Sequence, residues 1–161
     1  MTVLRKDPLL VGSLRYNRLT EKIDVTKVLW WNKEPCVLTN KGRKALRYFF
    51  EKYYGLFNES VMDDALDLEA YSKEYHPICE YLETLEWDGK ERIRNVLKVY
   101  MGADDSDMVY EMLKHFMMGA LNRIYCPGCK FDEMLCLVGQ QGAGKSTFFR
   151  FLALDDQWFS D

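Results

Sequence analysis

The sequence contains no long hydrophobic run and no excess of positive charge. Its longest apolar stretches fall far short of the roughly 20 residues that a membrane-spanning helix needs. A net charge of -3 argues against a surface that is basic throughout. A signal peptide, internal repeats and low-complexity segments are also missing. These absences predict a cytoplasmic, globular protein without a membrane partner, in which any contact with nucleic acid depends on local basic patches.

The sequence has five cysteines, which is an odd number. An odd count without a signal peptide favours a reducing, intracellular setting over a disulfide framework. Cys126 and Cys129 form a CxxC motif, but zinc would need two further ligands at suitable spacing. We therefore favour ordinary loop or core cysteines, with a metal site or redox activity as the alternatives.

The composition that remains is typical of a folded domain, with 48% hydrophobic, 14% aromatic and 29% charged residues. A length of 161 residues allows one domain, or one small domain and part of another. Residues 1–35 read as an extended segment, in which Leu14–Asn17 and Lys22–Val25 flank a polar turn and predict a hairpin. Residues 36–126 read as a helical region, and the pattern changes again over 127–161.

Hydrophobic spacing and terminal residues predict the helices of the middle region. Gly55 and Gly102 fit positions just after a helix. Ser60 and Asp63 read as a capping box, and Pro77 suits a first helical turn. Predicted helices cover residues 40–54, 61–74, 77–85, 91–101 and 107–125.

A short apolar run, Met134–Val138, is typical of a strand buried on both faces of a parallel sheet. It leads into the sequence GQQGAGKS at 139–146, and Lys145–Leu152 reads as the following helix. The predicted fold class is a mostly α N-terminal region followed by the start of an α/β P-loop NTPase domain, in the order strand, P-loop, helix. Residues 127–161 would form this incomplete core.

The glycine-rich segment matches the phosphate-binding pattern G-x-x-x-x-G-K-[ST]. Its glycines permit left-handed backbone, so that amide groups point inward at an anion beside a helix N-terminus. We expect Lys145 to reach the β- and γ-phosphates of ATP as the catalytic residue, Ser146 to ligate Mg²⁺ with the nucleotide, and Thr147 to lie near the α-phosphate. The predicted nucleotide-binding residues are Gly139, Gln140, Gln141, Gly142, Ala143, Gly144, Lys145, Ser146 and Thr147.

An ATPase also needs an acidic strand that holds Mg²⁺ and a group that stabilises the γ-phosphate. No hydrophobic run ending in paired acidic residues follows the P-loop. Upstream, Val61–Asp64 is the nearest match, but it lies in a helical pattern. We therefore expect this chain to be inactive alone and to end early in the ATPase fold. A small P-loop kinase is disfavoured because such enzymes build their core after the P-loop.

Several blocks of the sequence resemble the virulence-associated protein E family. The strongest are the HP–YL–L-WDG-RI pattern over 76–93, the RIY–PGCKFD pattern over 123–132, the P-loop, and WFSD at 158–161. Arg15-Tyr16-Asn17 is similar to a weaker block near the start. The resemblance spans about residues 8–161, and it implies a phage or mobile-island ATPase related to superfamily 3 helicases.

Two functional hypotheses follow. The resemblance implies the ATP-binding portion of a mobile-element DNA replication ATPase, and leaves open whether it is a helicase. Such a protein at full length would assemble into a homo-oligomeric ring and contact DNA. The alternative is a truncated interaction module of a replication complex that does not hydrolyse ATP.

Other polar and aromatic residues have structural interpretations that we prefer. Basic side chains at 41–47 and 92–98 read as solvated helix faces, with phosphate contacts to DNA as the alternative. Tyr16, Trp30 and Trp31 are expected to pack rather than stack on bases, and Trp87 to lie in the core. His76 is expected at a helix entry, and Arg123 in an ion pair or at a helix end.

Overall fold

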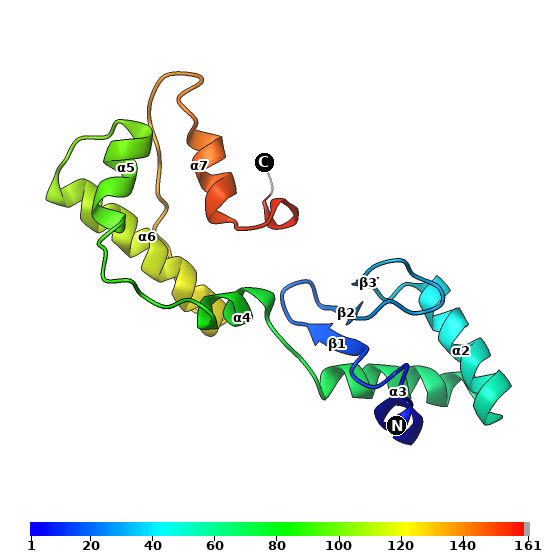
Figure 1. Ribbon diagram of the computed structural model, residues 1–161. Helices are drawn as coiled ribbons and strands as arrows, with labels where there is room; N and C mark the ends of the chain where they lie inside the picture. Colours follow the sequence, from blue (N-terminus) through cyan, green and yellow to red (C-terminus); the bar gives the residue numbers. More distant parts are fainter. Residues whose placement is uncertain (160–161) are drawn as a thin grey trace. The chain divides into compact units, whose positions relative to one another are not determined.

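The computed structural model describes residues 1–159. The chain divides into two compact units with the boundary between Leu85 and Glu86, the N-terminal unit before it and the C-terminal unit after it (Figure 1). None of the helices formed by residues 1–159 is long and apolar enough to cross a membrane. The described residues are mostly helical and contain one small antiparallel sheet.

The sheet lies in the N-terminal unit and confirms the predicted hairpin. Strands β1 (Leu14–Asn17) and β2 (Lys22–Val25) pair antiparallel, and the short β3 (Cys36–Val37) adds to β2. The carboxamide oxygen of Asn17 accepts hydrogen bonds from the backbone N–H groups of Leu19 (3.0 Å) and Thr20 (3.2 Å). This side chain therefore closes the polar turn that joins the two strands.

Four helices accompany the sheet in this unit: α1 (Thr2–Lys6), α2 (Asn40–Tyr54), α3 (Glu59–Tyr71) and α4 (Pro77–Glu83). The prediction for α2 is confirmed, because the helix ends at Gly55, whose φ of 64° is left-handed. The predicted capping box of α3 is wrong. Asn58 caps the helix by accepting from Val61 N–H at 3.1 Å, so α3 begins earlier and Ser60 falls inside its first turn.

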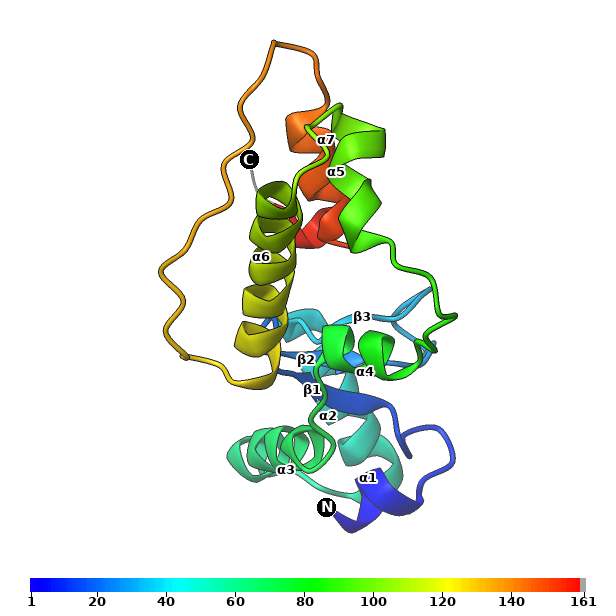
Figure 2. The ribbon, with the colours of Figure 1, turned by 90° about the vertical axis from the view of Figure 1, so that its left-hand side faces the viewer.

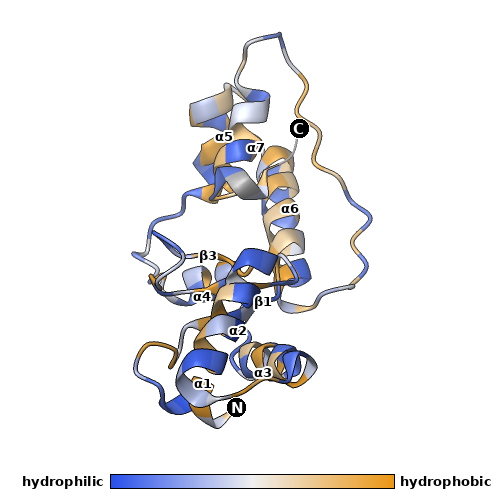
Figure 3. Ribbon diagram, turned by 90° about the vertical axis from the view of Figure 1, so that its right-hand side faces the viewer, coloured by the Kyte–Doolittle hydropathy of each residue, from blue (hydrophilic) through white to orange (hydrophobic). Residues whose placement is uncertain are grey.

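The core of the N-terminal unit is built from one face of α2, one face of α3 and the inner side of the sheet. Along α3, Met62, Leu66 and Ala70 recur at helical spacing and are buried. Polar residues separate them, so the helix shows alternating hydrophilic and hydrophobic bands (Figure 3). The other members of the core are Leu4, Leu10, Leu14, Val25, Leu29, Leu46, Phe49 and Phe50.

The Arg15-Tyr16-Asn17 block has structural partners within the N-terminal unit. The Arg15 guanidinium pairs with Glu80 of α4 at 2.5 Å, and Asn17 donates to Asp24 at 2.9 Å. The Tyr16 ring lies 4.2 Å from that of Tyr71. Each side chain of this block therefore joins β1 to a neighbouring element.

A buried carboxylate, Glu69, also stabilises this unit. Its side chain is 2% exposed and pairs with Arg5 at 2.7 Å and Lys73 at 2.6 Å. Burial acts to raise the pKa of Glu69, but the hydrogen bonds from Lys73 and Arg5 outweigh it and lower the pKa below its ordinary value. The ionised carboxylate is therefore the form that the folded unit prefers.

Glu69→Gln should reduce the free energy of unfolding at pH 7 by about 1–2 kcal/mol, because it removes a charged acceptor shared by two cations. Since the folded pKa is lowered, this contribution is complete above the ordinary pKa of about 4.3 and disappears as the pH falls through the folded value. Urea denaturation at pH 7 and pH 3 measures the difference. The exposed Glu74→Gln is the control, and a Glu69→Gln deficit that persists undiminished at pH 3 would contradict the account.

The C-terminal unit contains α5 (Ile93–Met101), α6 (Asp107–Tyr125), α7 (Lys145–Leu152) and a 3₁₀ turn at Asp156–Trp158. The predicted C-terminal end of α5 and both predicted ends of α6 are confirmed, whereas α5 begins at Ile93 rather than at residue 91. Gly102 follows α5 with a φ of 65°, and the Ser106 hydroxyl accepts from Val109 N–H at the start of α6. Ion pairs between Lys98 and Asp105 (2.7 Å) and between Arg94 and Asp107 (2.6 Å) connect the two helices around their short loop.

The strand predicted over Met134–Val138 is absent, and this corrects the predicted α/β start of the domain. The whole connection from α6 to α7 is drawn without helix or strand (Figure 2). Met134 is 81% and Val138 98% exposed, and Cys136 is exposed as well. A parallel strand exists only when neighbours satisfy its backbone groups. Residues 1–159 pair no strand with this segment, so its apolar side chains alone do not make it one.

Candidate functional site

The predicted P-loop lies directly before α7, and the described structure confirms that helix from Lys145 to Leu152. Gly144 is the residue before the first turn, with φ 78° and ψ 16°. Phe148 N–H donates to the Gly144 carbonyl at 2.9 Å, which closes the first helical turn. The motif therefore occupies a loop that ends at a helix N-terminus, the position that anion binding requires.

Two glycines of the loop adopt backbone conformations that other residues rarely take. Gly142 has φ 83° and Gly144 has φ 78°. A Cβ atom at either position would meet nothing within 4 Å. Glycine is therefore needed at these two positions for its backbone freedom rather than for space. Of the two glycines that the motif fixes, Gly144 has the expected left-handed backbone, whereas Gly139 does not.

The N-terminus of α7 leaves amide donors free for an anion. Gly144 has no side chain with which to cap the helix, and no side-chain cap hydrogen bond is present at this end. The first amide groups of a helix have no carbonyl partner within the helix, and they carry the positive end of its dipole. Ser146 and Thr147 lie in this first turn and are exposed.

The side chain of Lys145 folds back over the loop. Its Nζ atom donates to the carbonyl oxygens of Gly139 at 2.9 Å and Gln140 at 2.8 Å. These contacts hold the ammonium beside the same loop whose amides are expected to face phosphate. Gln140, Gln141 and Ala143 are exposed and complete a continuous loop with the glycines. All the residues predicted to bind nucleotide thus come together around the start of α7.

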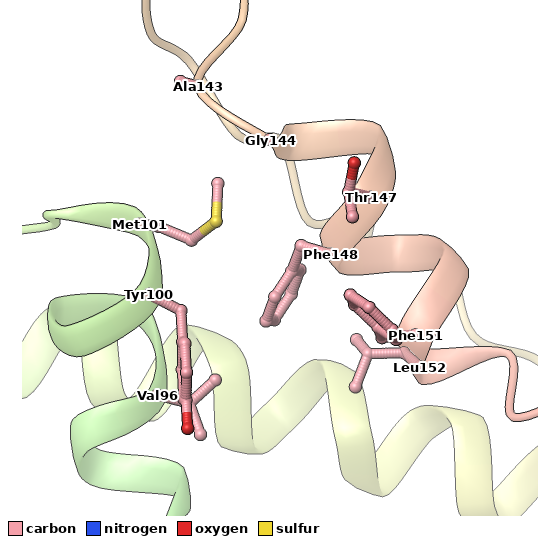
Figure 4. A pocket seen from close by; sticks show the side chains of 9 residues that line it. All are labelled: Val96, Tyr100, Met101, Ala143, Gly144, Thr147, Phe148, Phe151 and Leu152. Atoms are coloured by element: carbon pink, nitrogen blue, oxygen red, sulfur yellow. The ribbon is translucent and has the colours of Figure 1, made fainter.

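A pocket of about 450 Å³ adjoins the P-loop, and sequence reasoning missed it. It lies between α5, which contributes Val96 and Tyr100, and α7, which contributes Phe148 and Phe151. Figure 4 shows the rings of Phe148 and Phe151 pointing toward the space beside α5. The spacing of these residues by three or four positions on each helix is the only sequence signal for a shared apolar face.

Most of the other candidate residues have structural partners. Arg43 pairs with Asp67 at 2.6 Å and also with Asp63, while Arg47 contacts Asp63 and Glu59. These contacts tie α2 to α3 through ion pairs. Because these carboxylates offset the positive charge of Arg43 and Arg47, the two arginines would attract an external phosphate less strongly. Lys41 and Lys44 are exposed.

The aromatic, histidine and arginine predictions have mixed outcomes. Trp30 stacks on Phe49 at 4.6 Å, which confirms its packing role, and His76 stands at the entry to α4. The Arg123 guanidinium donates to the Phe131 carbonyl at 2.8 Å rather than to a carboxylate. Trp87 is 80% exposed, so its core assignment is wrong. It lies in the loop between α4 and α5, where no helix or strand packs its ring inward.

The cysteines of the CxxC motif are both free. Cys129 Sγ accepts a hydrogen bond from the Asn122 side chain at 3.3 Å, which links the loop to α6. Within residues 1–159, no group of three or more His, Cys, Asp or Glu side chains is placed to hold a metal ion.

Comparison with known proteins finds a family match for the C-terminal half of the chain. The family described as the Virulence-associated protein E-like domain matches residues 82–161, whereas no curated protein matches the chain. The match covers the P-loop and most of the blocks that carried the resemblance. Its last residues, Ser160 and Asp161, lie outside the described part of the structure. Through residues 82–161, this chain belongs to the Virulence-associated protein E-like domain family.

Proposed function

We propose that this chain is the ATP-binding portion of a DNA replication ATPase of a phage or mobile island. The observation that carries the proposal is the P-loop sequence at the start of α7, with Gly142 and Gly144 in left-handed conformations. Membership in the Virulence-associated protein E-like domain family supports the same class of protein. The C-terminal unit is thus assigned the phosphate end of a nucleotide site.

The residues around α7 fit a triphosphate and its magnesium ion. The uncapped helix N-terminus supplies amide donors, and Lys145 already contacts two loop carbonyls with an ammonium that an anion would attract more strongly. Loop amides from Gln140 to Thr147 would hold the phosphates, Lys145 the β- and γ-phosphates, and the exposed Ser146 hydroxyl the Mg²⁺. When bound, the magnesium ion neutralises phosphate charge.

We assign binding to this chain and hydrolysis to the full-length protein. Hydrolysis needs an acidic strand beside the P-loop and a cationic group at the γ-phosphate. Within residues 1–159, no strand of the C-terminal unit lies beside α7 to carry such an acidic residue. In the proposal, the full-length protein forms a homo-oligomeric ring on DNA, as the family resemblance implies, and the ring completes the site.

Calorimetric titration of the chain with Mg·ATP tests this assignment. We expect saturable binding at one site per chain, with a Kd in the range of about 1 μM to 1 mM that enzymes show for substrates. Chelating the magnesium should weaken binding, and Ser146→Ala should reduce the magnesium dependence because it removes the proposed hydroxyl ligand. A folded chain that gives no binding heat at several millimolar Mg·ATP would contradict the proposal and favour a non-hydrolysing interaction module.

A further inference from the structure

We propose that the pocket between α5 and α7 receives the base of the bound nucleotide, and that it holds the base by stacking with little discrimination between adenine and guanine. This inference rests on the proposed phosphate site and adds the other end of the ligand. Its volume of about 450 Å³ lies within the range of small-molecule pockets. The lining is mostly apolar and aromatic, as such pockets usually are.

The pocket and the P-loop share residues. Ala143, Gly144 and Thr147 line the pocket and also belong to the predicted phosphate-binding segment. Thr147 is the residue expected near the α-phosphate, which is the phosphate closest to the sugar and base. A triphosphate bound with its γ-end at Lys145 would therefore extend toward the pocket at its nucleoside end. Continuity with the loop makes a nucleobase the expected occupant.

The aromatic side chains of the pocket are free to stack. Tyr100 is 74% and Phe151 79% exposed, although both line the pocket. Figure 4 shows them on opposite helices, with Phe148 between them and Met101 reaching in from α5. Aromatic rings at the rim of an open pocket offer flat apolar faces to a planar base.

The pocket offers few groups that could distinguish one base from another. Among its lining side chains only Tyr100 and Thr147 carry a hydroxyl, and none carries an amide or a charge. Base edges are told apart by hydrogen bonds, whereas stacking accepts every base because each has a π-face. The side-chain chemistry of this pocket therefore favours a nucleotide site that accepts both purines.

Three ligands separate the base pocket from the phosphate site: Mg·ATP, Mg·GTP and magnesium tripolyphosphate, which has no base. The variants are Tyr100→Ala and Phe151→Ala, whose exposed side chains can be removed without opening the core. Tyr125→Ala, an exposed tyrosine on α6 that does not line the pocket, is the control. Binding is measured by calorimetry.

We expect each pocket variant to bind Mg·ATP roughly ten-fold more weakly while tripolyphosphate binding stays unchanged. The Tyr125→Ala control should match the unmodified chain, and GTP should bind within a few-fold of ATP. The inference is overturned if tripolyphosphate binds the unmodified chain as tightly as ATP, if the variants weaken both ligands equally, or if ATP is preferred over GTP a hundred-fold. Failure of all three ligands to bind would instead remove the phosphate site on which the inference rests.

Discussion

Lys145→Ala is expected to weaken Mg·ATP binding by this chain roughly a hundred-fold and to abolish ATP hydrolysis by the full-length protein. In the described structure the Lys145 ammonium sits against the carbonyls of Gly139 and Gln140, beside an uncapped helix N-terminus. Alanine removes the only side-chain cation of the loop, and the amides that remain cannot neutralise a triphosphate. Calorimetry on the chain and phosphate release by the full-length protein measure the two effects.

Two further variants separate charge from folding. Lys130→Ala removes an exposed lysine of the same unit, paired with Asp132 at 2.9 Å, and so changes the net charge equally. It should leave affinity nearly unchanged. Lys145→Gln keeps a donor for the loop carbonyls but loses the charge, and we expect it to be as impaired as Lys145→Ala. Full affinity or unchanged turnover in Lys145→Ala would refute the assignment of this residue.

The helices could be predicted because their signals are local. Gly55 and Gly102 end helices through their own backbone conformation, and Ser106 caps α6 through its own hydroxyl. Pro77 begins α4 because its missing N–H costs nothing in a first turn. The start of α3 was misplaced because two residues with capping side chains, Asn58 and Ser60, stand close together and the pattern alone does not choose between them.

The strand prediction was wrong because strand formation depends on partners that are distant in the sequence. A run such as Met134–Val138 states only that the segment is apolar, whereas a parallel strand also needs hydrogen-bonding partners from elsewhere in the chain. The described residues do not supply them, and the segment forms no strand, with Met134 and Val138 exposed and Leu135 and Leu137 half-buried. The prediction that Trp87 is buried was wrong for a related reason, because an apolar ring is buried only where another element covers it.

The candidate site also has one part that local sequence predicts, the loop before α7, and one part that it does not, the adjoining pocket. The turn at Gly144 and the start of α7 depend on adjacent residues, so the spacing of Gly139, Gly144 and Lys145 was enough to locate a loop that ends at a helix, and nucleotide binding by this loop stays a prediction. The adjoining pocket is lined by α5 and α7, which are separated in the sequence by α6 and a long connection. No periodicity within either helix states which other helix it will face, and the pocket therefore became visible only in three dimensions.

Two leucines of α3 allow a sharp test of the N-terminal core. Leu66 is fully buried, with an exposed fraction of 0%, whereas Leu68 on the same helix is 59% exposed. The two side chains are chemically identical and lie two residues apart in the interior of the same helix. Substituting each by alanine removes the same atoms and changes helix propensity by the same small amount. Any difference between the two variants therefore reports burial.

Leu66→Ala should lower the free energy of unfolding by about 2–5 kcal/mol, because it removes apolar contacts and leaves a cavity among residues of α2, α3 and the sheet. Leu68→Ala should change it by about 0.5 kcal/mol or less. Urea denaturation followed by tryptophan fluorescence measures both, and the indole of Trp30, stacked on the core residue Phe49, lies within this unit. Equal losses in the two variants would mean that α3 does not present the face described, and the assignment of Met62, Leu66 and Ala70 to one buried stripe would fall with it.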